Sequence, residues 1–397
     1  MDAKRWGIPA VFLALPFMFL VPGLIWKSQL MFFLITPAII AALSIENRWV
    51  KAGILYAVAW QIAIFLITFN TPDPKVVGSS LSMMMAIGAG AVLYKFVSVS
   101  ELPAEKWWAV LRWAVIAQMV IAVPQIVGVN PFMDIVRLFT KVEERLPGHL
   151  VGTLGNRNYL AAFIAYAVPA FIGWKTWKAA GRTINPALVA VMVFLFFCFS
   201  PGTLAAFLAM VVVYSWKHPW KKRLVWLAGG VAVAGGYTAY YVLSTGYHLG
   251  EFQALPSQFR EKMSTGKVTQ DWFQGDVGRF MMWFMAISKL LQHWAYVLFG
   301  YGPGAFWGRQ YPIHGEYVSI LFNYGLIGLV ILMGYIVSTW RFLAKKGDRI
   351  LIGMFAAICL DMVGNFPLQV ATTAAMICVI CGLIERERLK HGGLPVI

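Results

Sequence analysis

Long apolar runs separated by short polar stretches are the feature that most constrains this chain. Runs of about 17 residues or more recur from one end of the 397 residues to the other. A helix of roughly 20 apolar residues crosses about 30 Å of hydrocarbon, and inside a bilayer only helices and closed barrels satisfy their backbone hydrogen bonds. The pattern therefore predicts an all-α polytopic membrane protein, with residues 1–397 forming a single integral membrane domain.

The runs predict about 12 transmembrane helices. Their expected positions are 8–26, 28–45, 52–69, 77–97, 107–128, 157–174, 184–199, 201–216, 224–244, 316–340, 350–366 and 367–384. The last two come from one run, which would be about 52 Å long as a single helix, far more than a bilayer core. The segment Asn365-Phe366-Pro367 lies at its middle, and a residue before proline disfavours helix. We therefore split that run in two.

Basic residues decide the orientation. If the N-terminus is cytoplasmic and the apolar run 280–299 does not cross, most of the 33 Lys and Arg fall in cytoplasmic loops. If that run crossed, the basic segment Arg341–Arg349 would lie outside, against this bias. We expect both termini in the cytoplasm and 280–299 as a helix at the outer face. A second interfacial helix is expected within 129–156.

The external loop 246–315 is the longest polar interruption in the chain. In its apolar run, Arg279, Ala286, Lys289 and His293 share one helical face, which is typical of an amphipathic interfacial helix or of one that lines a wet cavity. The glycine-rich turn Gly300–Gly304 allows a sharp reversal that would bring this helix back toward His314. Such a loop is where chemistry on a polar substrate could take place.

Composition excludes other classes of site. The net charge of +16 is typical of nucleic-acid binding in a soluble protein, but here it marks cytoplasmic loops and leaves room for an anionic substrate or lipid headgroups. All the cysteines lie inside apolar runs, so they are expected to pack rather than form disulfides or metal sites: Cys198, Cys359, Cys378 and Cys381. We predict no metal, no cofactor and no nucleic-acid partner.

Four external residues carry the candidate chemistry. The guanidinium of Arg279 could hold phosphate oxygens with two parallel hydrogen bonds, or it could anchor the helix at headgroup level. His314 could accept a proton from a hydroxyl, or cap the helix that follows. Asn156 and Arg157 open a span, where a helix N-terminus favours anions, and Asn156 also suits a structural cap.

The order of short motifs along the chain resembles the O-antigen ligase and O-antigen polymerase superfamily, which also contains bacterial protein O-oligosaccharyltransferases. The matching segments are Gly152–Asn158, Ser200–Thr203, Gly278-Arg279 with Trp283, Gly300–Phe306, and His314–Tyr317 with Gly325–Gly328. The motifs cover roughly 152–330, and the layout of spans covers the whole chain. Their order and external placement, rather than any one of them, make the resemblance.

The resemblance implies a GT-C-type glycosyltransferase on the periplasmic face of the bacterial inner membrane. Such an enzyme takes a glycan from undecaprenyl pyrophosphate without a metal and transfers it, with inversion, to an acceptor hydroxyl. Arg279 matches the loop arginine of the family, and His314 matches its essential histidine. The acceptor would be lipid A core in a ligase, a further glycan repeat in a polymerase, or a protein; of these we favour the ligase.

Two departures from the family pattern shape the site. Pro201 stands where members often have arginine, so Arg157, with Asn156, is the candidate to share the donor pyrophosphate with Arg279. Asn323 stands where members often have glutamate. Supporting roles then fall to Glu316, Lys289 and Tyr317.

A transporter or flippase is the rival class, and its expected marks are ionisable residues deep in spans and broken helices repeated in two halves. Asp361 is the one deep carboxylate, and the halves show no repeat.

Overall fold

The computed structural model describes residues 42–69, 74–127, 157–172, 185–198, 200–215, 276–302, 315–365 and 371–391, together with the turn 152–154 and a few single positions. About 85% of the described residues are helical, and none of them lies in a strand. The predicted all-α class is therefore confirmed for this part of the chain.

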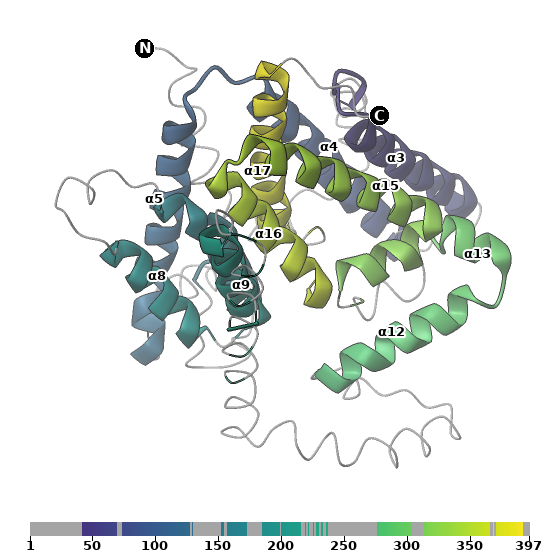
Figure 1. The fold of residues 1–397 in the computed structure, drawn as a ribbon. Coiled ribbons are helices and arrows are strands. Elements are labelled where there is room, and N and C mark those ends of the chain that lie inside the picture. Colours follow the sequence, from purple (N-terminus) through teal and green to yellow (C-terminus); the bar gives the residue numbers. More distant parts are fainter. Residues whose placement is uncertain are drawn as a thin grey trace.

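The helices follow the predicted runs closely (Figure 1). In chain order they are α3 (Arg48–Phe69), α4 (Pro74–Ser98), α5 (Ala104–Ala122), α7 (Arg157–Ala167), α8 (Pro186–Phe197), α9 (Pro201–Ser215), α12 (Asp276–Leu290), α13 (Trp294–Phe299), α15 (Glu316–Lys346), α16 (Arg349–Gly364) and α17 (Ala371–Lys390). Short 3₁₀ segments extend two of them, η2 (Val123–Val127) after α5 and η3 (Val168–Phe171) after α7.

Two of the described helical stretches, Ala104–Gln125 and Glu316–Lys346, are long and apolar enough to cross a membrane. The predicted spans 8–26, 28–45 and 224–244 and the predicted helix within 129–156 lie wholly or largely outside the described residues.

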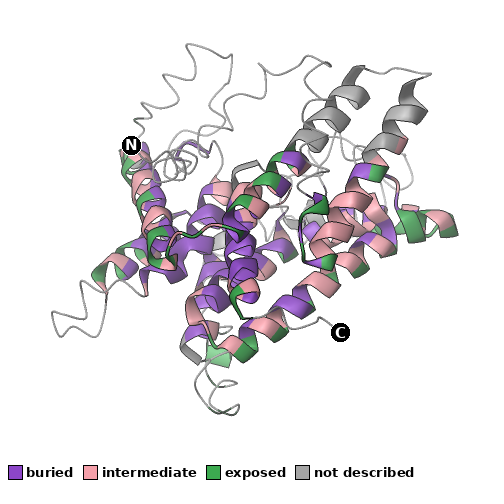
Figure 2. Cartoon of the chain, turned by 90° about the horizontal axis from the view of Figure 1, so that it is seen from above, coloured by how far each residue is buried: buried purple, intermediate pink, exposed green. Residues whose placement is uncertain are grey.

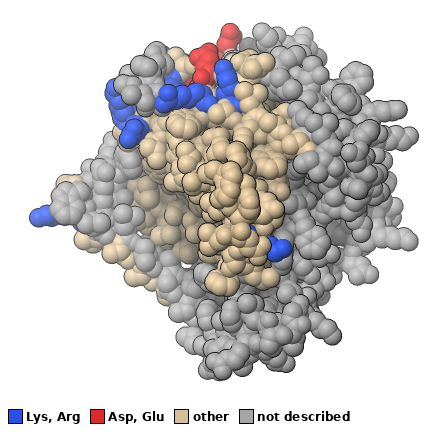
Figure 3. All heavy atoms as spheres, turned by 90° about the vertical axis from the view of Figure 1, so that its right-hand side faces the viewer, with Lys and Arg blue, Asp and Glu red and all other residues tan. Residues whose placement is uncertain are grey.

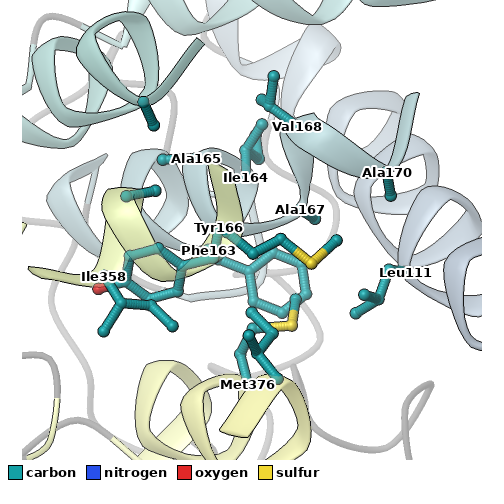
Figure 4. Close-up of a cluster of buried hydrophobic side chains, with 14 of the residues drawn as sticks. Leu111, Phe163, Ile164, Ala165, Tyr166, Ala167, Val168, Ala170, Ile358 and Met376 are labelled. Atoms are coloured by element: carbon teal, nitrogen blue, oxygen red, sulfur yellow. The ribbon is translucent and has the colours of Figure 1, made fainter. Parts of the chain in front are cut away.

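The core is built around α7. Its residues from Leu160 onward are at most 2% exposed, and α5, α9, α16 and α17 all contact it. Alternating alanines let these neighbours approach closely, while Phe163 and Tyr166 fill the space toward Ile358 of α16 and Met376 of α17 (Figure 4). Figure 2 shows the same concentration of buried residues at the centre of the helices. The core therefore sits at the middle of the bundle and leaves the helix ends to carry polar groups.

The long run 350–384 divides as predicted. Helix α16 begins at the cap Asp348, whose carboxylate accepts from the amides of Ile350 and Leu351 at 3.1 and 3.2 Å. It ends at Gly364, and α17 begins at Ala371. The connection between them contains Pro367, which cannot donate a helical hydrogen bond.

One end of the bundle gathers basic residues. Asn47, just before α3, donates to Glu385 of α17 at 3.1 Å, and Arg388 pairs with the same carboxylate at 3.2 Å. Lys346, at the end of α15, pairs with Glu387 of α17. These contacts bring the start of α3 and the ends of α15 and α17 together as the basic end. Figure 3 shows lysine and arginine atoms clustered at the top of one face, above a broad uncharged surface.

The expectation of one continuous helix over 280–299 is wrong. The segment forms two helices, because the chain breaks at 291–293 and His293 caps α13, its Nδ1 accepting from the amide of Ala295 at 3.2 Å. On the face predicted to be polar, Ala286 is 4% exposed and packs against the protein, whereas His293 is exposed. Exposed apolar side chains occupy other faces: Phe284, Ile287 and Leu291.

Candidate active site at the start of α15

The start of α15 meets α12 at a glycine. Gly315 has φ +99°, and a Cβ added there would lie 2.9 Å from both the Trp283 ring and the Val363 carbonyl oxygen. Trp283 is one helical turn after Arg279, and Gly315 directly follows His314. The structure therefore brings the backbone beside His314 against the helix that carries Arg279. His314 itself and the side chain of Arg279 lie outside the described residues.

A small apolar cluster holds α12 in this position. Ala286 and Leu290 of α12 pack with Ile313 and Phe322, and all four are buried. Trp283 packs against the edge of the same cluster. Because two turns of α12 are anchored to both sides of the Gly315 turn, the rotation of α12 about its axis is set by burial rather than by its polar residues.

Helix α15 contains a break that the sequence analysis did not predict. Gly325 has φ +66° and ψ −168°, a conformation open essentially to glycine alone. A break leaves the preceding carbonyls without their helical donors. Three groups from elsewhere replace them: the amide of Tyr301 donates to Phe322 O at 2.8 Å, the amide of Gly302 to Asn323 O at 2.9 Å, and the hydroxyl of Tyr56 to Tyr324 O at 3.0 Å.

The glycine-rich turn has a second role besides the reversal that we expected. Its described residues, Gly300 to Gly302, press against the break in α15. A Cβ on Gly300 would lie 2.5 Å from Asn323 O, and one on Gly325 would lie 2.5 Å from Gly300 N. Glycine is needed on both sides because two backbones touch, so the turn clamps the broken helix as well as reversing the chain.

Glu316 and Tyr317, predicted to support His314, make contacts that hold the backbone of the turn. The Glu316 carboxylate is 2% exposed and accepts from the amide of Leu368 at 2.9 Å. The Tyr317 hydroxyl donates to Cys359 O of α16 at 3.0 Å. Both side chains therefore fasten the start of α15 to α16 and to the α16–α17 connection, and we assign them to positioning.

Asp361 also makes hydrogen bonds that hold helices together near the start of α15. Its carboxylate accepts from the Tyr166 hydroxyl at 2.5 Å and from the Asn365 amide at 2.6 Å. Tyr166 comes from α7 and also interacts electrostatically with Glu316. Tyr166 could not be singled out from the sequence, because a tyrosine in an apolar run carries no signal of its partner. The buried carboxylate that marked the transporter alternative is thus engaged in holding α7, α16 and the turn after α16.

Two glutamines hold the Gly-Thr part of the first motif. Gln118 donates to Thr153 Oγ1 at 2.8 Å and accepts from its amide at 3.0 Å, while Gln125 donates to Gly152 O at 3.0 Å and accepts from its amide at 2.9 Å. Gly152 has φ +57°, and a Cβ there would lie 2.5 Å from Gln118 Oε1. This part of the motif is therefore structural, and it fixes the approach to α7.

Arg157 is the first residue of α7 and is partly buried. It interacts electrostatically with Cys198, two residues before the buried Ser200. Helix α7, which begins at Arg157, packs against α9, which begins at Pro201 in the Ser200–Thr203 turn. Asn156 lies outside the described residues. Helix α16 contacts both α7, which begins at Arg157, and α15, which follows the Gly315 turn.

Lys289 lies in the last turn of α12, and its carbonyl accepts from the Tyr301 hydroxyl at 3.2 Å. Among the described residues, no three His, Cys, Asp or Glu side chains gather where they could hold a metal ion. Metal independence stays a prediction.

The comparisons with known proteins add no family. No protein-family model matches the chain, and a search of curated proteins finds no similar protein. The functional assignment therefore depends on the residues of the chain and on the contact between Trp283 and Gly315.

Proposed function

We propose that this protein is a membrane glycosyltransferase of the O-antigen ligase type. It would move a glycan from an undecaprenyl-pyrophosphate carrier to a hydroxyl of lipid A core. The observation that carries the proposal is the packing of Trp283 on Gly315, because it brings the helix of Arg279 against the turn of His314. A phosphate-binding residue and a proton acceptor beside each other are what this reaction needs.

The proposed reaction requires one bond to form and one to break. The oxygen of the acceptor hydroxyl attacks the anomeric carbon, and its proton passes to His314. The bond from that carbon to the pyrophosphate oxygen breaks with its electron pair, and undecaprenyl pyrophosphate leaves. Arg279 stabilises the charge that develops on the leaving group, and Arg157 shares it. Attack opposite the leaving group inverts the anomeric configuration.

The proposal includes twelve spans, both termini in the cytoplasm of a bacterial cell, and the site on the periplasmic side of the inner membrane. Two observations support it. The basic end gathers the start of α3 with the ends of α15 and α17, as cytoplasmic loops would. At the other end of α15, helices α12 and α13 expose apolar side chains that suit a membrane interface: Phe284, Ile287, Leu291 and Trp294.

A transfer assay with purified protein tests the proposal. Lipid A core and undecaprenyl-linked repeats are offered together as acceptors to a labelled lipid-linked donor. We expect transfer to lipid A core, lost on His314→Ala with donor binding kept, and reduced on Arg279→Ala with donor binding weakened. Arg341→Ala, an exposed arginine at the basic end, is the control and should act like the parent.

The products separate the alternatives. Elongated lipid-linked repeats would make the protein a polymerase, and glycosylated protein would make it a protein O-oligosaccharyltransferase. If detergent-solubilised protein consumes no donor but sealed vesicles move it across the bilayer, the protein is a transporter or flippase and the proposal is wrong.

A further inference from the structure

A cavity of about 350 Å³ lies between α3, α4, α15, α16 and α17. Small residues of α3 and α4 leave this space open, among them Gly53, Ala57, Ala86 and Gly90. Most of the other lining residues are apolar. The cavity is partly open to the outside. An apolar cavity of this kind does not hold water well, and its size is that of a binding site for an organic molecule. A hydrocarbon chain is the matching occupant.

The two ends of the cavity differ in charge. At one end Trp49 lines it, with the Arg48 guanidinium 5.4 Å from the centre of the Trp49 ring and Lys51 within one helical turn. At the other end lie Glu316 and Asn323. None of the described residues lining the cavity is Lys or Arg. The charges around this end are Arg48, Lys51 and the buried pair Arg388 and Glu385 behind Tyr94, which together leave it positive. An anionic group therefore belongs at the Trp49 end.

Trp49 is built into this end. Its ring packs against Gly334 of α15, where an added Cβ would lie 2.6 Å from ring carbons. Its Nε1 is buried and has no hydrogen-bond partner within the described part of the chain. A buried donor without an acceptor is costly. An ester carbonyl or phosphate oxygen of a bound molecule would supply the acceptor.

We propose that this cavity binds one acyl chain of an anionic phospholipid, whose phosphate lies at Arg48 and Lys51. The acyl chain runs along α3 toward Asn323. The headgroup lies at the basic end, where clusters of Lys and Arg attract anionic lipid. The cavity reaches Glu316 near the proposed transfer site, but its headgroup end lies at the opposite end of α15. The proposal rests on the Trp49 end and does not depend on the glycosyltransferase assignment.

Native mass spectrometry of the purified full chain tests the proposal. The protein is titrated with phosphatidylglycerol or phosphatidylcholine, and the bound lipid is counted. We expect one tightly bound phosphatidylglycerol, with phosphatidylcholine at least tenfold weaker. The double variant R48A/K51A should bind phosphatidylglycerol at least tenfold more weakly than the parent. The matched control R341A/K345A removes two exposed charges from the same end and should bind like the parent.

A second pair of variants tests whether the acyl chain of the lipid occupies the cavity. Gly53→Phe should fill the cavity and abolish binding, whereas Gly53→Ala should bind, because its Cβ would meet only Ile331 at an ordinary 3.5 Å. Equal loss in R48A/K51A and R341A/K345A, equal binding of both lipids, or full binding by a folded Gly53→Phe would each overturn the proposal. Displacement of phosphatidylglycerol by undecaprenyl phosphate would also overturn it and would assign the cavity to the donor lipid.

Discussion

For several single residues the sequence allows two roles, and the contacts in the structure favour one of them. Glu316 and Asp361 are buried carboxylates that pattern analysis treats as candidates for chemistry, yet each accepts hydrogen bonds that fasten helices together. Arg157 shows the reverse. As the first residue of a buried helix it resembles an anchor, but α7 packs against α9, and we propose that Arg157 binds the donor pyrophosphate there. Contacts, rather than residue type, separate these cases.

Arg157→Ala tests the proposed sharing of pyrophosphate. Loss of charge-assisted hydrogen bonds costs about 1.5–3 kcal/mol, so donor turnover should fall roughly tenfold to a hundredfold. Arg157→Lys keeps the charge without the planar fork and should rescue only part of the loss. Donor affinity and turnover are measured on folded protein in detergent. An alanine variant that binds and turns over donor normally would leave Arg157 as an anchor.

Glu387 gives a pH-dependent prediction at the basic end. Burial alone would raise the pKa of this carboxyl, but Lys346 and Lys390 beside it lower the pKa to about 2. Because the folded pKa is depressed, the stabilisation is present above the ordinary value near 4.5 and is lost as pH falls toward 2. The thermal unfolding temperature should therefore fall more steeply between pH 6 and pH 3 in the parent than in Glu387→Gln. Parallel curves would contradict the pairing.

At the scale of elements, breaks define the proposed site more than the helices do. Helix α15 breaks at Gly325, the run 280–299 breaks before His293, and the last run breaks before Pro367. At the first break, Tyr56, Tyr301 and Gly302 donate to the carbonyls that the break leaves free. The same clamp ties α13 and the glycine turn to α15, so the position of α12 beside Gly315 depends on it.

Gly325→Ala should disrupt this clamp. The backbone strain at Gly325 costs about 1–3 kcal/mol for a non-glycine residue, and the new Cβ would also collide with Gly300 N. Gly347→Ala is the matched control, since its φ is +72° but nothing lies within 4 Å of an added Cβ. Thermal unfolding in detergent should show a clearly larger drop in unfolding temperature for Gly325→Ala than for Gly347→Ala. Equal losses would mean that the two backbones do not touch.

At the scale of the whole molecule, charge and polarity are separated along α15. Its end at Lys346 belongs to the basic end, while its start at Glu316 faces α12 and the proposed transfer site. In the proposed orientation the basic end lies in the cytoplasm, because basic residues favour that side of a membrane. The headgroup end of the proposed lipid site and the proposed transfer site would then lie at opposite faces of the bilayer.

Cysteine labelling tests this orientation. In a background without the four native cysteines, Ser257→Cys and Gln310→Cys should both react with an impermeant thiol reagent in intact spheroplasts, because the loop 246–315 is expected outside. Lys345→Cys, exposed at the basic end, should react only after the membrane is opened. Reaction at position 257 but not at 310 would show that 280–299 crosses the membrane.

The sequence by itself determined where most of the described helices lie. Apolar runs, the cap Asp348 and the break before Pro367 are local signals, and local signals can be recognised without knowing the fold. It also singled out Trp283 and Gly315 within motifs, although not the contact between them. Only the tertiary structure decided that contact, the clamp at Gly325, the Tyr166–Asp361 bond and the cavity beside Trp49. Each joins residues far apart in the chain, and the amino acids involved carry no mark of the partner that burial selects for them.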